Sequence, residues 1–213
     1  MNFQKLVNSK LNVIADWIIR VVMINVMIIT FSLPVITIFP AISSGYNMFL
    51  DYLSNKEVHL FKDYWKYFRE SIGRKILFGI FILIVFFLGF SNINYYTRVL
   101  QNSVTIFDQV GYYVSMAMLA VAYAITLYTP AVIKVYPKIG FINFFRVAFV
   151  LAGKFYLTTM LLVLANSVPL LLLLVPQLAV VFIFGAISLA LILNVTLTRK
   201  AIIYLQELGD QNG

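Results

Sequence analysis

Residues 76–93 read ILFGIFILIVFFLGFSNI, a run of eighteen residues without a charged side chain. A helix of about 17 to 25 mainly apolar residues is what crosses the hydrocarbon core of a bilayer. Similar stretches occur at residues 17–33, 110–133, 155–175 and 178–198. A soluble domain has about a quarter of its residues charged, whereas this chain has 11% charged and 62% apolar residues. The sequence therefore predicts an all-α, polytopic membrane helix bundle.

A weaker apolar stretch at residues 35–53 contains Pro40 and Asp51, and the charge pattern decides its place. Cytoplasmic loops of membrane proteins are enriched in Lys and Arg. If only the five strong spans crossed, the basic residues before the first span would face the side opposite those of residues 56–75. With six crossings, fifteen of the sixteen Lys and Arg residues share one side, and only Arg98 lies on the other. We therefore expect about six transmembrane helices, the second short or re-entrant, with the N- and C-termini cytoplasmic.

The net charge of +8 follows from the same bias and indicates a lipid bilayer with anionic headgroups as a partner, with no nucleic acid. The chain has no cysteine, and its single histidine, His59, lies in a predicted cytoplasmic loop. Structural metal sites and haem sites need more ligands than this. No phosphate-binding glycine motif occurs either. The sequence thus predicts a protein that is not an enzyme, with no catalytic residue, no metal and no cofactor.

Several polar residues in or near the spans have structural explanations. Asp16 and Arg20 are four residues apart at the start of the first span, so they can pair on one helical face. Asn25 and Asn194 are expected to form hydrogen bonds between helices.

Residues 61–72 have the pattern of an amphipathic helix between the second and third spans. One face is charged and includes Arg69. The apolar side chains recur at helical spacing and are Phe61, Tyr64, Trp65, Phe68 and Ile72. We expect this helix to lie along the cytoplasmic headgroups with Trp65 and Phe68 toward the acyl chains. The alternative is a docking helix that packs on protein.

A fainter amphipathic copy at residues 141–152 follows the fourth span. Both copies lead through a glycine and a base into the next span, at Gly73-Arg74 and Gly153-Lys154, 80 residues apart. This spacing suggests an internal repeat of about residues 35–95 and 110–175, within a single integral membrane domain of residues 1–213.

Prolines lie at or near the ends of the spans, several with Thr or Asn beside them. Proline removes one helical hydrogen bond, so it exposes carbonyls that a neighbouring side chain or a substrate can engage. The candidates for a helix break or a path are Pro34, Thr37, Pro40, Pro130, Asn166 and Pro169. Ordinary helix ends and kinks explain the same pattern without a path. No ionisable residue lies deep in a span, which argues against a self-contained proton-coupled pump.

The stretch LPVITIFPA at residues 33–41, followed by Phe61-Lys-Asp63 and Phe68-Arg-Glu70, resembles the YesL-like family of small Gram-positive bacterial integral membrane proteins. The resemblance covers about the first 75 residues, with Phe39 where a glycine is expected before Pro40. It implies a bacterial plasma membrane, an association with sugar-uptake transporters, and no established biochemical activity.

Two functions remain open. The first is a non-enzymatic accessory or permease-like component linked to carbohydrate uptake. Its amphipathic helices would dock on a sugar-uptake transporter component or on a soluble cytoplasmic protein. The second is a stand-alone small-solute or lipid-handling transporter with a path along the proline-broken helices.

Overall fold

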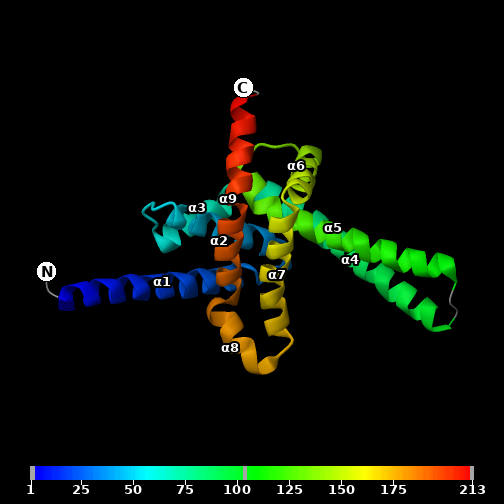
Figure 1. Ribbon diagram of the computed structural model, residues 1–213, viewed down its shortest axis with the longest axis horizontal. Helices are drawn as coiled ribbons and strands as arrows, with labels where there is room; N and C mark the ends of the chain where they lie inside the picture. The colour runs from blue at the N-terminus through cyan, green and yellow to red at the C-terminus, as the bar shows by residue number, and fades with distance from the viewer. Residues whose placement is uncertain (1–2, 103–104, 212–213) are drawn as a thin grey trace. The chain divides into compact units, whose positions relative to one another are not determined.

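The computed structural model describes residues 3–102 and 105–211 of the chain (Figure 1). Every regular element in this part is helical, which confirms the predicted all-α class. The elements are α1 (Phe3–Phe31), η1 (Val35–Thr37), α2 (Ile38–Leu53), α3 (Leu60–Arg69), α4 (Ile72–Asn102), α5 (Ile106–Val135), α6 (Phe141–Lys154), α7 (Tyr156–Leu173), η2 (Pro176–Leu178), α8 (Ala179–Val181), η3 (Phe182–Ala186, a π-helical turn) and α9 (Ile187–Gln211).

Four helical segments of the described chain are long and apolar enough to cross a membrane. They are Leu11–Phe31, Ile72–Gln101, Ile106–Val135 and Pro176–Gly209. A fifth arises if α6 and α7, which are bent by 101° relative to each other, form one broken span. This arrangement is typical of a multi-pass membrane protein.

The crossing of α2 stays a prediction, because the helix is short. It has 16 residues, which at about 1.5 Å per residue reach roughly 24 Å, less than the hydrocarbon thickness of about 30 Å. The predicted crossing by α7 alone also stays a prediction. Between them, these two helices decide whether the chain crosses the membrane four, five or six times.

Apolar side chains on α4 are exposed to the surroundings of the protein. Phe87 is 71% exposed, Leu88 56% and Phe90 58%. Water disfavours such a continuous apolar surface, whereas lipid tails accept it. The middle of α4 therefore has the surface of a lipid-facing helix.

The chain divides into two compact units, residues 1–70 with 164–196 (unit 1) and residues 71–163 with 197–213 (unit 2). In unit 1, α2 packs against α1 and α3, and α1 also packs against η3 (Figure 1). The core of this unit is formed by α2, because its side chains Ala41, Tyr46, Met48 and Phe49 are all inaccessible.

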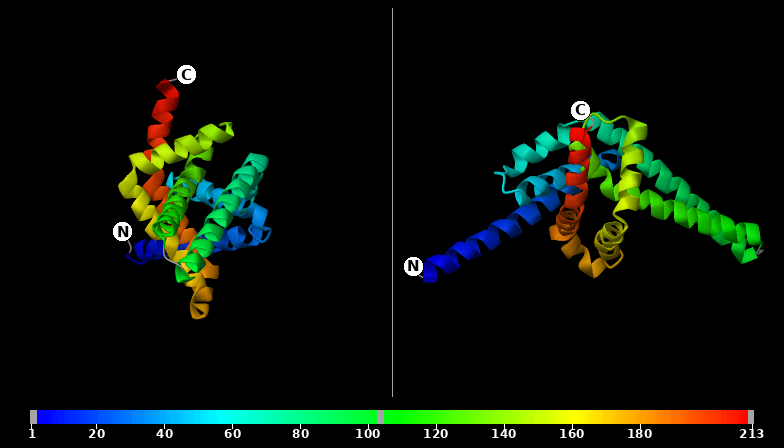
Figure 2. Two further views of the ribbon diagram at one scale, coloured as in Figure 1. Left: turned by 90° about the vertical axis from the view of Figure 1, so that its right-hand side faces the viewer. Right: turned by 45° about the horizontal axis from the view of Figure 1, so that its top comes forward.

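In unit 2, α4 and α5 lie side by side, as Figures 1 and 2 show, and α6 packs against α5. The close approach of α4 and α5 depends on Gly89, where a Cβ would lie only 2.3 Å from Leu119 Cδ2. Near the start of α4, the ring of Phe78 stacks on that of Phe144 in α6, with 3.8 Å between the ring centroids. Aromatic packing thus fixes α6 to α4.

The order of a predicted span, an amphipathic helix and another predicted span occurs twice, as α2-α3-α4 and α5-α6-α7. The residues that align in the sequence take different places, however. Gly73 and Arg74 lie inside the first turns of α4, whereas Gly153 and Lys154 end α6. The internal repeat and the single domain of residues 1–213 therefore stay predictions.

Candidate functional site

At the break between α1 and α2, the side chain of Thr37 donates hydrogen bonds to backbone carbonyls. Helix α1 ends at Phe31, and Pro34 precedes the short turn η1. Thr37 Oγ1 donates to the carbonyl oxygens of Phe31 and Pro34, at 2.6 and 2.7 Å. An unpaired carbonyl in hydrocarbon costs several kcal/mol. Thr37 therefore bonds two carbonyls at this break. Neither belongs to Thr30 or Ile36, the residues whose usual helical partner would be the N–H that Pro34 or Pro40 lacks, so the prediction that Thr37 bonds a carbonyl left free by proline is not met in that form.

The second proline of the break lies in the first turn of α2. Pro40 is buried, whereas Pro34 is exposed. The carbonyl of Pro40 accepts a hydrogen bond of 2.7 Å from Ser44 Oγ, one turn further along. Both prolines therefore mark the ends of helices, and hydroxyl side chains engage the carbonyls beside them.

Helix α3 docks over this break. The ring of Phe31, the last residue of α1, lies 5.5 Å from the ring of Tyr64 and 5.0 Å from that of Phe68, measured between centroids. Tyr64 OH donates to the carbonyl of Ala41 at 3.1 Å. The predicted helix break and the predicted docking helix are thus parts of one assembly within unit 1.

The orientation of α3 corrects one expectation from the sequence. Phe68 was expected to point toward acyl chains, but it packs on protein and is only 7% exposed. Tyr64 is 1% exposed, whereas Phe61 and Trp65 are 66% and 46% exposed. The predicted apolar stripe therefore divides into a buried part and an exposed part, and Ile72 belongs to α4.

A second contact between α3 and α2 was not predicted from the sequence. Tyr67 OH donates to the carboxylate of Asp51, which also pairs with Lys56 Nζ at 2.9 Å. The pKa of Tyr67 is raised mainly by burial and further by the Asp51 carboxylate. The pKa of Tyr64 is raised by burial alone. Both phenols therefore stay neutral donors at physiological pH. In the sequence, only the carboxylate of Asp51 near the end of the apolar helix α2 indicated that a polar partner was needed there.

The exposed surface of α3 combines aromatic and basic side chains. We call it the α3 outer edge, formed by Phe61, Lys62, Trp65, Lys66 and Arg69, all of them exposed. The Arg69 guanidinium lies 5.8 Å from the centroid of the Trp65 ring. The N-terminus of the helix is fixed by Asp63, whose carboxylate accepts from the His59 backbone N–H at 2.7 Å.

The predicted pair of Asp16 and Arg20 is confirmed, with 2.7 Å between Arg20 Nε and Asp16 Oδ2. Tyr52 OH also donates to this carboxylate, at 3.1 Å, and the guanidinium lies 4.5 Å from the Tyr52 ring centroid. The pair thus links α1 to the end of α2. This placement supports a structural role at the edge of the first span.

Asn25 joins α1 to the π-helical turn η3. Its Nδ2 donates to the carbonyls of Phe182 and Ile183, at 2.9 and 2.6 Å, and its Oδ1 accepts from the Ser188 backbone N–H at 2.9 Å. A π-helical turn displaces backbone groups from their usual α-helical partners, and such turns are frequent at functional sites. The expected bonding of Asn25 between helices is confirmed.

Residues 21–93 match the sequence model of one family, described as "Protein of unknown function, DUF624". The matched segment includes Asn25, the break, α2 and α3, and it extends into α4. No curated protein and no solved structure matches the chain. This DUF624 segment therefore includes the break and α3 in unit 1, where most of these contacts lie, and the first part of α4 in unit 2.

The remaining proline candidates lie outside the DUF624 segment. Pro130 is buried inside α5, and the carbonyl that it deprives of a partner, that of Thr126, accepts from Thr129 Oγ1 at 2.5 Å. Pro169 is buried inside α7, and Asn166 is half-buried. None of the six candidate break residues lines either of the two cavities of unit 2 discussed below. The path along these helices stays a prediction.

Two further observations concern ionisable residues. Lys75, which the sequence placed in a cytoplasmic loop, is only 1% exposed near the start of α4. Among residues 3–102 and 105–211, no three His, Cys, Asp or Glu side chains come together in an arrangement that could hold a metal ion. His59 is exposed on the loop before α3.

Proposed function

We propose that the protein is a non-enzymatic, multi-pass protein of a bacterial plasma membrane that serves as an accessory or permease-like component in carbohydrate uptake. The resemblance to the YesL-like family supports the membrane and the link to sugar uptake, and the DUF624 match falls on the same part of the chain. The partner is a sugar-uptake transporter component or a soluble cytoplasmic protein. The observation that carries the proposal is the α3 outer edge.

The α3 outer edge has the features of a docking surface. Tyr64, Tyr67 and Phe68 hold the helix on α1 and α2, so the opposite side is presented on a fixed support. Trp and Arg are the residues that contribute most often to binding energy at protein interfaces. The bias of Lys and Arg supports a cytoplasmic position for this helix. Coupling helices of ATP-driven importers dock on their soluble subunits in this way.

Replacing Phe61 and Trp65 together by Ser should weaken the docking, because each removes an exposed aromatic anchor. We expect recovery of the co-expressed ATPase subunit of a sugar importer to fall about tenfold or more in a pull-down in mild detergent. Phe149→Ser is the matched control, because Phe149 on α6 is 57% exposed. Undiminished recovery with the double variant would contradict the docking role.

We also propose six crossings, with α2 and α7 each spanning the membrane and both termini in the cytoplasm. Single cysteines can test this in a chain that has none of its own. In intact cells, a membrane-impermeant thiol reagent should label Gln101→Cys but neither Lys62→Cys nor Gln206→Cys. Opening the cells should expose the last two positions and serves as the control. Labelling of Lys62→Cys in intact cells would exclude the six-span arrangement.

One observation favours the second candidate, a stand-alone small-solute or lipid-handling transporter. Ser43 Oγ and Asn47 Oδ1 lie four residues apart on α2, are buried, and have no hydrogen-bond partner in the described part of the chain. Buried polar atoms normally have a partner, so water or a solute would satisfy them. This function predicts solute uptake by the purified protein alone in liposomes, whereas the accessory function predicts uptake only with the partner.

A further inference from the structure

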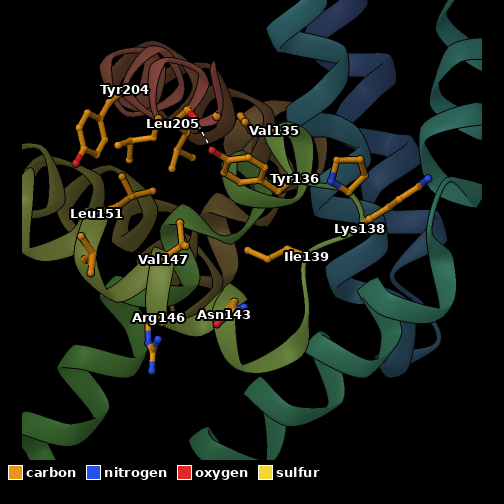
Figure 3. Close-up of a pocket in the computed structure, with 14 residues that line it drawn as sticks. Val135, Tyr136, Lys138, Ile139, Asn143, Arg146, Val147, Leu151, Tyr204 and Leu205 are labelled. Atoms are coloured by element: carbon orange, nitrogen blue, oxygen red, sulfur yellow. Dashed lines mark hydrogen bonds between the residues drawn. The ribbon is translucent and has the colours of Figure 1, made fainter. Parts of the chain in front are cut away.

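Unit 2 contains a cavity of about 820 Å³ between the end of α5, helix α6 and the last part of α9 (Figure 3). Sites for small molecules commonly have volumes of about 300 to 1,000 Å³ and mostly apolar walls with a few polar groups. This cavity follows that pattern. Its apolar walls include Val135, Ile139, Val147, Leu151 and Leu205.

The walls of the cavity are fixed by contacts within unit 2. Tyr136 OH donates to the carbonyl of Leu205 at 2.5 Å and so ties the segment after α5 to α9 (Figure 3). The Lys154 ammonium also lies 3.3 Å from the centroid of the Tyr204 ring, and this contact joins the end of α6 to α9. Contacts between α9 and both the segment after α5 and the end of α6 therefore hold the walls of the cavity together.

The rim of the cavity is basic. Lys138 and Arg146 belong to its lining and are exposed, and Figure 3 shows their charged ends turned away from the apolar centre. Asn143 is a further polar side chain of the lining, and the described lining residues include no Asp or Glu. Neither cation forms an ion pair with a described residue. Two cations without an ion-pair partner among the described residues thus lie beside an apolar cavity.

We propose that this cavity binds one anionic phospholipid, with an acyl chain against the apolar walls and the phosphate at the basic rim to which Lys138 and Arg146 contribute. An apolar interior with cations only at the rim is complementary to an anionic amphiphile. The bias of Lys and Arg places this end of α5, α6 and α9 on the cytoplasmic side. Basic pockets between transmembrane helices on that side bind anionic headgroups. The site is independent of the docking role of α3.

A second cavity in unit 2 provides a contrast. It has a volume of about 380 Å³ and is bordered by α4, α5 and α6, with Phe81, Phe86 and Phe145 in its walls. None of its described lining residues is charged. A lipid chain in this cavity would show no preference for an anionic headgroup, so headgroup preference reports on the larger cavity.

The purified full-length chain in non-ionic detergent can be offered equal amounts of phosphatidylglycerol and phosphatidylcholine, and the retained lipid counted by native mass spectrometry. We expect phosphatidylglycerol to be preferred by about tenfold, because each cation near an anionic lipid contributes a several-fold gain in affinity. Lys138→Gln with Arg146→Gln should bring the two lipids close to parity. Both side chains are exposed, so the variant should fold.

Lys62→Gln with Arg69→Gln on α3 is the matched control and should keep the preference. Val147→Phe, which fills the cavity, should reduce the retention of both lipids. Glycerol phosphate should not displace phosphatidylglycerol, because the proposed site needs the acyl chain. Equal retention of the two lipids by the unmodified protein, an unchanged preference after loss of Lys138 and Arg146, or displacement by glycerol phosphate would each overturn the proposal.

Discussion

Replacing Asn25 by Leu is expected to lower the free energy of unfolding by about 2 to 4 kcal/mol. The side chain is inaccessible and makes three hydrogen bonds to backbone groups of η3 and Ser188. A single side-chain hydrogen bond between membrane helices contributes only about 0.6 kcal/mol on average. The expected effect is larger because Leu would leave two carbonyls and one N–H without their partner in an apolar surrounding.

Thermal unfolding in detergent micelles would measure this effect. Asn92→Leu is the matched control, because Asn92 is exposed on α4. Asn25→Asp is a sharper variant, since it keeps the size and the acceptor but replaces the amide donor by an oxygen that faces two carbonyls. It should be at least as damaging as Asn25→Leu. Wild-type stability in both variants would show that η3 does not depend on Asn25.

The positions of the long helices followed from the sequence, because a run such as residues 76–93 has only one stable state in a bilayer. Contacts between residues close in the chain could also be predicted from the sequence. The pair of Asp16 and Arg20 and the bonds of Thr37 connect residues that are close in the chain, so helical spacing and the chemistry of proline indicated them.

The burial of α3 did not follow from its sequence. Helical periodicity identifies an apolar face, but lipid and protein interior are both apolar, so the pattern cannot tell which of them covers Phe68. Tyr67 was missed because it does not belong to the predicted apolar stripe, although a phenol can be buried where its hydroxyl reaches a carboxylate. Contact with Asp51 on another helix supplies that partner.

The partner of Asn25 was hidden for a different reason. The carbonyl of Phe182 is 157 residues away along the chain, and the turn η3 contains no proline to mark it. A π-helical turn is a local departure that tertiary contacts stabilise, so nothing in the apolar run of residues 178–198 indicates it. The sequence showed that Asn25 needs a partner in the membrane but not where the partner lies.

Replacing Thr37 by Val is expected to lower the free energy of unfolding by about 1 to 3 kcal/mol, because it removes the hydroxyl that donates to the carbonyl of Phe31. Thr37→Ser is the matched control and should be close to neutral. In either variant, the carbonyl of Pro34 still accepts the hydrogen bond of 2.8 Å from the backbone N–H of residue 37. The predicted loss therefore comes from the end of α1. Thermal unfolding in detergent is the measurement, and equal stability of the Val and Ser variants would contradict it.

The same pair of variants separates the two proposed functions. If the break only ends two helices, Thr37→Val in normally inserted protein should keep docking and sugar uptake, after correction for the amount of folded protein. If the break lines a transport path, Thr37→Val should abolish uptake by the protein in liposomes, while Thr37→Ser restores it. The bonds of Thr37 to its own backbone favour the first result, because a hydroxyl already engaged at 2.6 and 2.7 Å has little left to offer a solute. Loss of uptake in a folded Thr37→Val protein would therefore support the transporter over the accessory component.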